Sequence, residues 1–195
     1  MAAEVTGVLL AGGRSTRFGR DKLREPYRGA PLAHHAARAL ASVCGEVVVV
    51  VAPGRPAPDL PAGPPFRVVR DAREGEGPLA GILAALGDLS TPLALVAGAD
   101  MPGLAPPVLA EMLRVAREAR VQAVVLAEGD GHRPLPCVLR REVREPASAL
   151  FSSGERSVRG LLGALRVAVI EEDTWRALDP TGETLRDVDR PEDLE

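Results

Sequence analysis

Short apolar runs that end at glycine or at a charged residue recur along the first two thirds of the chain. Residues 5–10 form the first run, and residues 47–51 are five consecutive valines. Uninterrupted apolar runs of this length are typical of strands that are buried on both faces, as in the interior of a parallel sheet. The pattern predicts strands at Glu4–Leu10, Val47–Val51, Phe66–Val69, Leu93–Ala97 and Ala123–Leu126.

Between these runs, apolar residues recur at the spacing of one helix face. The first such segment starts with Pro31, a residue that suits the first turn of a helix. Strands that alternate with helices indicate an α/β fold with a doubly wound, mostly parallel sheet. The predicted helices are Pro31–Val43, Pro78–Leu86 and Pro106–Ala119, and the proline-rich segment Pro53–Pro65 is predicted to be a surface loop.

The alternation of strands and helices changes after Gly129. In this part the sequence predicts short strands at Pro134–Leu139, Arg166–Ile170 and Leu185–Val188. It also predicts helical segments within Glu142–Leu165, interrupted at Pro146 and at Ser152–Gly154, and a helix start in Arg190–Leu194. The length of 195 residues and the absence of repeats favour a single domain over residues 1–195.

The overall composition excludes several classes of protein. A formal charge of −3 argues against a broad nucleic-acid surface, and an aromatic content of 3% leaves few rings for stacking on bases. The two cysteines have no CxxC spacing, so neither a disulfide nor zinc is expected. No apolar stretch approaches the length of a membrane span, and Glu4 stands where a signal peptide would carry its cations, so no signal sequence is expected. We expect a cytoplasmic protein that binds neither nucleic acid nor a membrane.

The first predicted strand runs into Gly12-Gly13, followed by three arginines and Lys22. Glycines let backbone amides approach an anion closely, and the cations add charge, so the loop is a candidate phosphate site. Neither the Walker pattern nor GxGxxG is present. Lys22 is the only lysine among 24 basic residues. The loop can have kept one lysine by chance, or because a compact ammonium suits a phosphate better than a guanidinium.

Two aspartates follow other predicted strands. Asp71 comes after Phe66–Val69 and Asp100 after Leu93–Ala97, and ligands in open α/β sheets bind at the carboxyl ends of strands. A carboxylate that faces a phosphate loop suits Mg²⁺, which takes one or two carboxylates together with substrate phosphates. The alternatives are that Asp100 caps the following helix and that Asp71 is a turn residue.

The loop Leu10–Lys22 resembles the signature loop of the sugar-phosphate-type nucleotidyltransferases, and within these it is most similar to the molybdenum cofactor guanylyltransferases. The second loop, Gly77–Gly81, and the motif Asp100-Met101-Pro102 also match that family, and the similarity extends over essentially the whole chain. The resemblance implies a Rossmann-like nucleotidyltransferase fold, with a nucleotide-binding half at about 1–128 and an acceptor-binding half at about 129–195.

The family implies transfer of GMP from GTP to a molybdopterin-type cofactor with release of pyrophosphate. Arg17, Lys22 and Asp100 would be catalytic, with Asp100 as the Mg²⁺ ligand. The nucleotide would be bound by Leu10, Ala11, Gly12, Gly13, Lys22, Asp71 and Asp100. The pterin would lie near His132–Leu139 or Gly154–Val158, and proteins that deliver or accept the cofactor would make transient contacts.

The chain departs from the family pattern in its closing motif. The family usually carries asparagines where this chain has Asp187 and Asp189, and cytidylyltransferase relatives use aspartates there, one of which can ligate metal. The sequence contains no asparagine at all, so composition can also explain the difference. The alternatives are therefore a CTP-dependent molybdopterin cytidylyltransferase, another small-molecule phosphate nucleotidyltransferase, or a nucleotide-binding module without catalysis.

Overall fold

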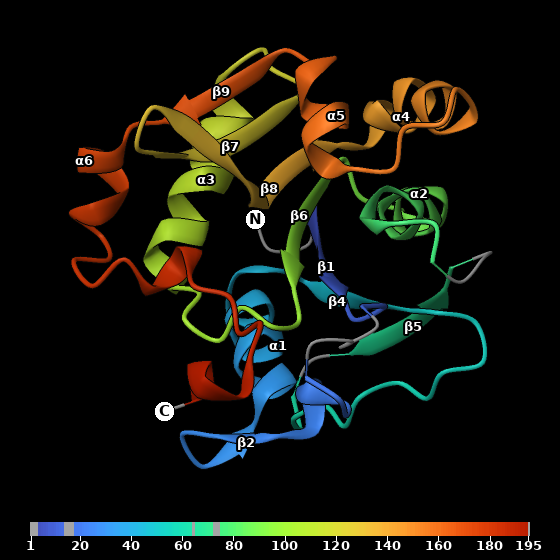
Figure 1. The fold of residues 1–195 in the computed structure, drawn as a ribbon. Coiled ribbons are helices and arrows are strands. Elements are labelled where there is room, and N and C mark those ends of the chain that lie inside the picture. Colours follow the sequence, from blue (N-terminus) through green and yellow to red (C-terminus); the bar gives the residue numbers. More distant parts are fainter. Residues whose placement is uncertain (1–3, 14–17, 64, 72–74, 195) are drawn as a thin grey trace.

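Within residues 4–13, 18–63, 65–71 and 75–194, which the computed structural model describes, the central element is a seven-stranded sheet (Figure 1). Its strand order is β5-β4-β1-β6-β8-β7-β9. Neighbouring strands are parallel, except that β8 runs antiparallel to both β6 and β7. The predicted α/β class with a mostly parallel sheet is confirmed. The strands are β1 (Val5–Leu10), β4 (Glu46–Val51), β5 (Phe66–Arg70), β6 (Leu93–Gly98), β7 (Ala123–Glu128), β8 (Gly131–Arg140) and β9 (Val167–Ile170).

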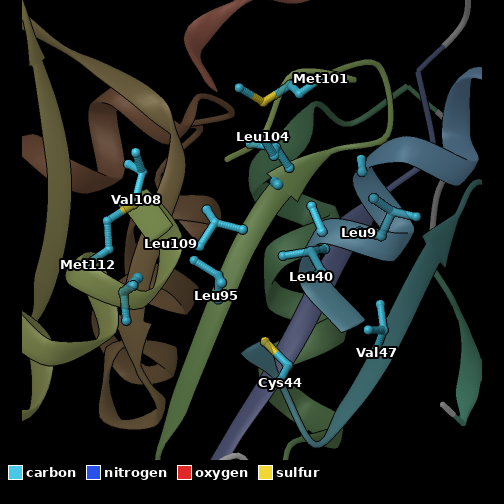
Figure 2. Close-up of a cluster of buried hydrophobic side chains, with 14 of the residues drawn as sticks. Leu9, Leu40, Cys44, Val47, Leu95, Met101, Leu104, Val108, Leu109 and Met112 are labelled. Carbon is cyan, nitrogen blue, oxygen red and sulfur yellow. The ribbon is translucent and has the colours of Figure 1, made fainter. Parts of the chain in front are cut away.

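Helices cover both faces of the sheet (Figure 1). The helices α1 (Leu32–Val43) and α3 (Pro106–Glu118) pack on one face, and α2 (Pro78–Asp88), α4 (Arg144–Ser152) and α5 (Val158–Gly163) pack on the other. Successive side chains of a strand point to opposite faces. Leu9 and Leu95 therefore join the core that Figure 2 shows, whereas their neighbours Val8 and Val96 join the core on the other face.

A smaller apolar cluster joins the two ends of the chain. Phe18, Tyr27, Leu32 and Val188 are buried together, and Leu194 packs against them. Phe18 lies in the second half of the loop Leu10–Lys22, and Val188 belongs to the closing segment, which we define as residues 186–189. The cluster therefore holds the closing segment next to the end of the loop. The short elements near it are β2 (Pro26–Tyr27), β3 (Ala30–Pro31), and the 3-10 turns η2 (Lys22–Arg24), η4 (Glu183–Leu185) and η5 (Pro191–Leu194).

Several expectations for the second half were wrong. The predicted strand Leu185–Val188 is absent: η4 ends at Leu185, and the closing segment joins no sheet. Pro146 does not interrupt a helix but lies in the first turn of α4, where a missing amide hydrogen costs no helical bond. The helix α6 (Glu172–Arg176) was not predicted. It is anchored by the buried Trp175, whose indole Nε1 donates to the Ala127 carbonyl at 2.9 Å.

The two cysteines are free thiols inside the two cores. Burial raises the pKa of Cys44 to about 12, and it also raises the pKa of Cys137 to about 12. Both thiols are therefore protonated at neutral pH, which makes them poor nucleophiles. Among the described residues, no helix has the length and apolar character that crossing a lipid bilayer requires.

Candidate functional site

A cavity of about 420 Å³ opens at the carboxyl ends of β1, β4 and β6. This is the edge at which open α/β sheets bind ligands. The cavity brings together residues from three loops that are far apart in the sequence. Of the residues that the sequence singled out, Leu10, Gly12, Gly13, Asp71 and Asp100 line it.

Ala11 and Arg17 differ from these five residues. The Ala11 amide donates to the Val50 carbonyl at 2.8 Å, and this hydrogen bond continues the pairing of β1 with β4 by one residue. Ala11 lines a neighbouring cavity of about 200 Å³ rather than the main one. Arg17 lies outside the described residues. The role of Ala11 in nucleotide binding and the catalytic role of Arg17 stay predictions.

Glycines bring the second loop close to the sheet. A Cβ at Gly81 would stand 3.3 Å from side-chain atoms of Leu10 and Val50, so the N-terminal turn of α2 can lie against β1 and β4 only with little bulk there. Gly77 has a φ of 82°, a conformation that favours glycine. Both glycines line the cavity. The two glycines of the Gly77–Gly81 loop are therefore needed for backbone conformation and for close packing against the sheet.

Asp100 is positioned by hydrogen bonds of the loop after β6. The neighbouring Ala99 amide donates to the Leu10 carbonyl at 3.0 Å, and the Val188 amide donates to the Asp100 carbonyl at 2.9 Å. The side chain lines the cavity and is 30% exposed. The N-cap of α3 is Ala105, which has no side-chain capping bond. The interpretation of Asp100 as a helix cap is therefore wrong.

Lys22 is buried and forms a link between the site and the closing segment. Its Nζ lies 2.9 Å from Asp100 Oδ2 and 3.3 Å from Asp189 Oδ1, and it donates to the Val188 carbonyl at 2.6 Å. Burial by itself lowers the pKa of this ammonium, but the charges and hydrogen bonds of Asp100 and Asp189 outweigh it and raise the pKa above its usual value. Lys22 does not line the cavity itself, but it is a permanent cation directly behind Asp100, which does.

The donor set around Asp100 fits Mg²⁺ bound together with a phosphate. The described residues contain no group of three or more His, Cys, Asp or Glu side chains that could hold a metal alone. Mg²⁺ does not need such a cage, because it binds through one or two carboxylates plus phosphate oxygens and water. Asp100 offers one carboxylate at the cavity, and the Asp189 carboxylate shares the Lys22 ammonium with it.

The candidate pterin-binding segment His132–Leu139, which is part of β8, lies beside the cavity and Asp100. Leu135 of β8 lines the cavity. Arg133 on the same strand donates to the Leu185 carbonyl at 2.8 Å and lies 3.5 Å from Asp187 Oδ1. The strand β8 therefore runs from the cavity toward the start of the closing segment. His35 lies outside this segment and is hydrogen-bonded through Nε2 to the Tyr27 carbonyl at 2.8 Å.

Sequence reasoning assigned no individual role to two charged residues near the cavity, although Arg156 lies within the candidate pterin segment Gly154–Val158. Glu76 lines the cavity, and Arg156, from the turn before α5, lies 2.9 Å from the Glu76 carboxylate through its Nε. The glycines on both sides of Glu76 allowed a loop to be predicted here, but they gave no indication of what the glutamate contacts. The partner is 80 positions away along the chain, so no local pattern could pair the two residues.

Asp189→Asn tests whether the closing segment holds a second metal. The Asp189 side chain is 50% exposed, and an ion pair this exposed typically contributes no more than about 1 kcal/mol. We therefore expect the turnover number to fall by less than about fivefold, with an unchanged Mg²⁺ dependence. Steady-state rates over a Mg²⁺ titration measure this. A larger loss that excess Mg²⁺ restores would show instead that Asp189 is a metal ligand.

Comparisons with known proteins agree with the geometry. The family described as "MobA-like NTP transferase domain" matches residues 7–169. A probable molybdenum cofactor guanylyltransferase from Chloroflexus aggregans is 34% identical over 197 residues, which cover 97% of this chain and 91% of the relative. Another protein of that name, from Mycobacterium avium, is 33% identical over 166 residues, covering 83% of this chain and 82% of the relative.

Solved structures show the same fold. The molybdopterin-guanine dinucleotide biosynthesis protein A from Archaeoglobus fulgidus superimposes with a TM-score of 0.80 at 22% identity, covering 97% of this chain and 94% of that one. A 2-C-methyl-D-erythritol 4-phosphate cytidylyltransferase from Thermus thermophilus gives 0.68 at 20% identity, covering 96% and 94%. The fold alone is thus shared by proteins named for different bases, whereas sequence similarity is to the guanylyltransferases. The chain belongs to the MobA-like NTP transferase family.

Proposed function

We propose that this protein transfers GMP from GTP to the terminal phosphate of a molybdopterin-type cofactor and releases pyrophosphate. The observation that carries the proposal is the cavity at the strand ends, where glycines of the first loop, Asp71 and Asp100 come together. The membership in the MobA-like family and the names of the relatives support the choice of substrates. We place the enzyme in the cytoplasm, with transient contacts to the proteins that deliver and accept the cofactor.

The reaction exchanges one phosphate bond for another. A terminal phosphate oxygen of the acceptor forms a bond to the α-phosphorus of GTP, while the bond from that phosphorus to the bridging oxygen of pyrophosphate breaks and its electron pair leaves with the pyrophosphate. The attacking oxygen is already anionic, so no strong general base is needed. Catalysis then consists of positioning the two anions and stabilising the charge that develops between them.

The chain offers groups for both tasks. The Gly12-Gly13 turn leaves space for the nucleotide at the end of β1, since a Cβ at Gly13 would meet nothing within 4 Å. Lys22 supplies a positive charge beside Asp100. Arg17 is assigned to the phosphates from the sequence. A Mg²⁺ ion bound through Asp100 would add positive charge on the phosphate oxygens.

The closing segment is well placed to line the acceptor side. Its backbone is fixed to the site twice, since the Val188 amide donates to the Asp100 carbonyl and the Val188 carbonyl accepts from Lys22. The neighbouring carboxylates of Asp187 and Asp189 are about half exposed. They can therefore meet polar groups of an acceptor that approaches from the β8 side.

A thermal-shift panel with Mg²⁺ and GTP, CTP, UTP or ATP tests the choice of base. At one hundred times its dissociation constant a ligand stabilises the folded state by about 2.7 kcal/mol. For a chain of this size that corresponds to roughly 5–10 °C in melting temperature. We expect this shift with GTP and a clearly smaller one with CTP. An equal or larger shift with CTP would favour the cytidylyltransferase alternative.

Pyrophosphate release separates an enzyme from a nucleotide-binding module. We expect release only when GTP, Mg²⁺ and molybdopterin are all present. Binding of GTP without any release of pyrophosphate under these conditions would contradict the catalytic assignment. It would favour the alternative of a nucleotide-binding module without catalysis. Release with a sugar phosphate in place of molybdopterin would instead point to the other small-molecule alternative.

A further inference from the structure

The segment Gly75–Gly77 forms part of the cavity wall and is held by the second half of the chain. All three of its residues line the cavity. Gly77 lies so close to Arg156 that a Cβ added there would stand 2.7 Å from the Arg156 carbonyl oxygen. The Leu79 amide, in the first turn of α2, donates to the same oxygen at 3.2 Å. The backbone at Arg156 therefore fixes the point at which this segment joins α2.

The side chain of Arg156 makes a second connection to the segment. Its Nε lies 2.9 Å from Glu76 Oε2. This carboxylate oxygen is buried and makes no hydrogen bond within the described part of the chain. The contact is thus a charge pair without a directed hydrogen bond, and the arginine is the cation that compensates the charge at this oxygen. The Glu76 side chain as a whole is 23% exposed and that of Arg156 42%, so without its cation the shielded oxygen can reach water only if the carboxylate turns.

Arg156 is itself held in one orientation. Its guanidinium lies over the ring of Phe151, 4.1 Å from the centroid. The same group donates to the carbonyls of Phe151, at 2.8 Å, and Glu155, at 2.9 Å. The cation therefore reaches Glu76 from a fixed support at the end of α4, and it does not behave as a mobile surface arginine.

We propose that Arg156 is a positioning residue for nucleotide binding, which holds the Gly75–Gly77 wall of the cavity in place through Glu76. Without the arginine, the Glu76 carboxylate must turn toward water, and its movement displaces Gly77 and the start of α2. The ion pair includes none of the residues assigned to phosphoryl transfer. Its loss therefore weakens GTP binding and leaves the chemical step nearly intact. This inference rests on the proposed nucleotide site.

A double-mutant cycle of Arg156→Ala and Glu76→Gln tests the proposal. We expect Arg156→Ala to weaken GTP binding and to raise KM for GTP about tenfold, with kcat changed by less than about twofold. Glu76→Gln alone should have a smaller effect, because a neutral amide does not need the cation. In the double variant most of the GTP affinity should return, since no uncompensated charge remains. Calorimetric titration with GTP and steady-state kinetics provide the measurements.

Two further variants keep the test independent of folding. Arg159→Ala removes an exposed arginine three positions further along and should leave GTP binding unchanged. Arg156→Lys keeps the positive charge and should retain more GTP affinity than Arg156→Ala. If Arg156→Ala does not fold, the comparison of Arg156→Lys with and without Glu76→Gln replaces it, with a smaller expected recovery.

The proposal is overturned if the double variant binds GTP as poorly as Arg156→Ala, because charge compensation is then not the function of the arginine. It is also overturned if Arg156→Ala binds GTP normally, or if only kcat or the KM for the acceptor changes. A wild-type protein that binds no nucleotide would contradict the proposed function itself, an outcome that the wild-type titration distinguishes from all the others.

Discussion

Exchanging Lys22 for arginine should reduce kcat by about 10²–10³, the usual cost of losing one well-placed electrostatic stabiliser. The ammonium lies in a narrow place, between Asp100 Oδ2, the Val188 carbonyl and Asp189. A guanidinium is longer and planar, and it cannot put its charge at the same point. Lys22→Ala should lose as much turnover or more, and it should also lose GTP affinity. Single-turnover rates and GTP titrations measure the two effects separately.

The buried position of Lys22 also predicts a loss of stability. From the sequence alone, Lys22→Arg is expected to change the melting temperature little. In the structure the side chain is 10% exposed and is surrounded by acceptors. Leaving such acceptors without a donor costs roughly 2–3 kcal/mol, which is about 5–10 °C in melting temperature. We therefore expect both Lys22 variants to melt earlier than the parent.

Arg114→Lys provides the matched control for Lys22→Arg. Arg114 lies on the exposed surface of α3 and pairs with Glu111 and Glu118. The exchange makes the reverse change of cation far from the cavity, so the turnover number should stay the same. A Lys22→Arg variant that turns over at the parent rate would mean that the only lysine was kept by chance. Because it is the only lysine, isotope-labelled lysine would give one signal, which should shift when GTP binds.

The sequence was sufficient for the central part of the fold because the core strands are buried on both faces. The valines of β4 alternate between the two cores, as expected for an apolar run in a strand that is covered on both faces. The loops after β1, β5 and β6 could be placed together for the same reason, since parallel strands end at one edge of a sheet. The cavity there contains Gly12, Asp71 and Asp100, as this reasoning predicts.

The closing segment could not be predicted, because its environment is made by distant residues. Val188 is flanked by two aspartates, and with Leu185 it resembles a short strand. In the structure it is buried against Phe18, Tyr27 and Leu32 and accepts a hydrogen bond from a lysine 166 positions earlier. The local sequence shows an apolar residue between charged ones, but it does not show which distant side chains Val188 packs against. For the same reason, the sequence singled out Lys22 as a candidate residue and missed its contact with the closing segment.

Replacing Asp100 with asparagine should abolish turnover, with a loss of about 10³ or more in kcat. Asparagine keeps the shape of the side chain and can still accept a hydrogen bond from Lys22, so the fold should survive. It does not keep the negative charge that would hold Mg²⁺ in the proposed mechanism, and metal stabilisation of a phosphoryl transition state is worth several kcal/mol. Each 1.36 kcal/mol corresponds to a factor of ten in rate. Pyrophosphate release at increasing Mg²⁺ concentration measures the loss.

The effect of Asp100→Asn should come from chemistry and not from instability. The variant keeps the backbone hydrogen bonds that join Asp100 to Val188, and Asp189 remains as a carboxylate partner for Lys22. Its melting temperature should therefore stay within a few degrees of that of the parent. Asp173→Asn, on the exposed side of α6, removes the same charge away from the cavity and should turn over normally. If Asp100→Asn retained activity at saturating Mg²⁺, the metal would have to bind elsewhere, and the assignment of Asp100 would be wrong.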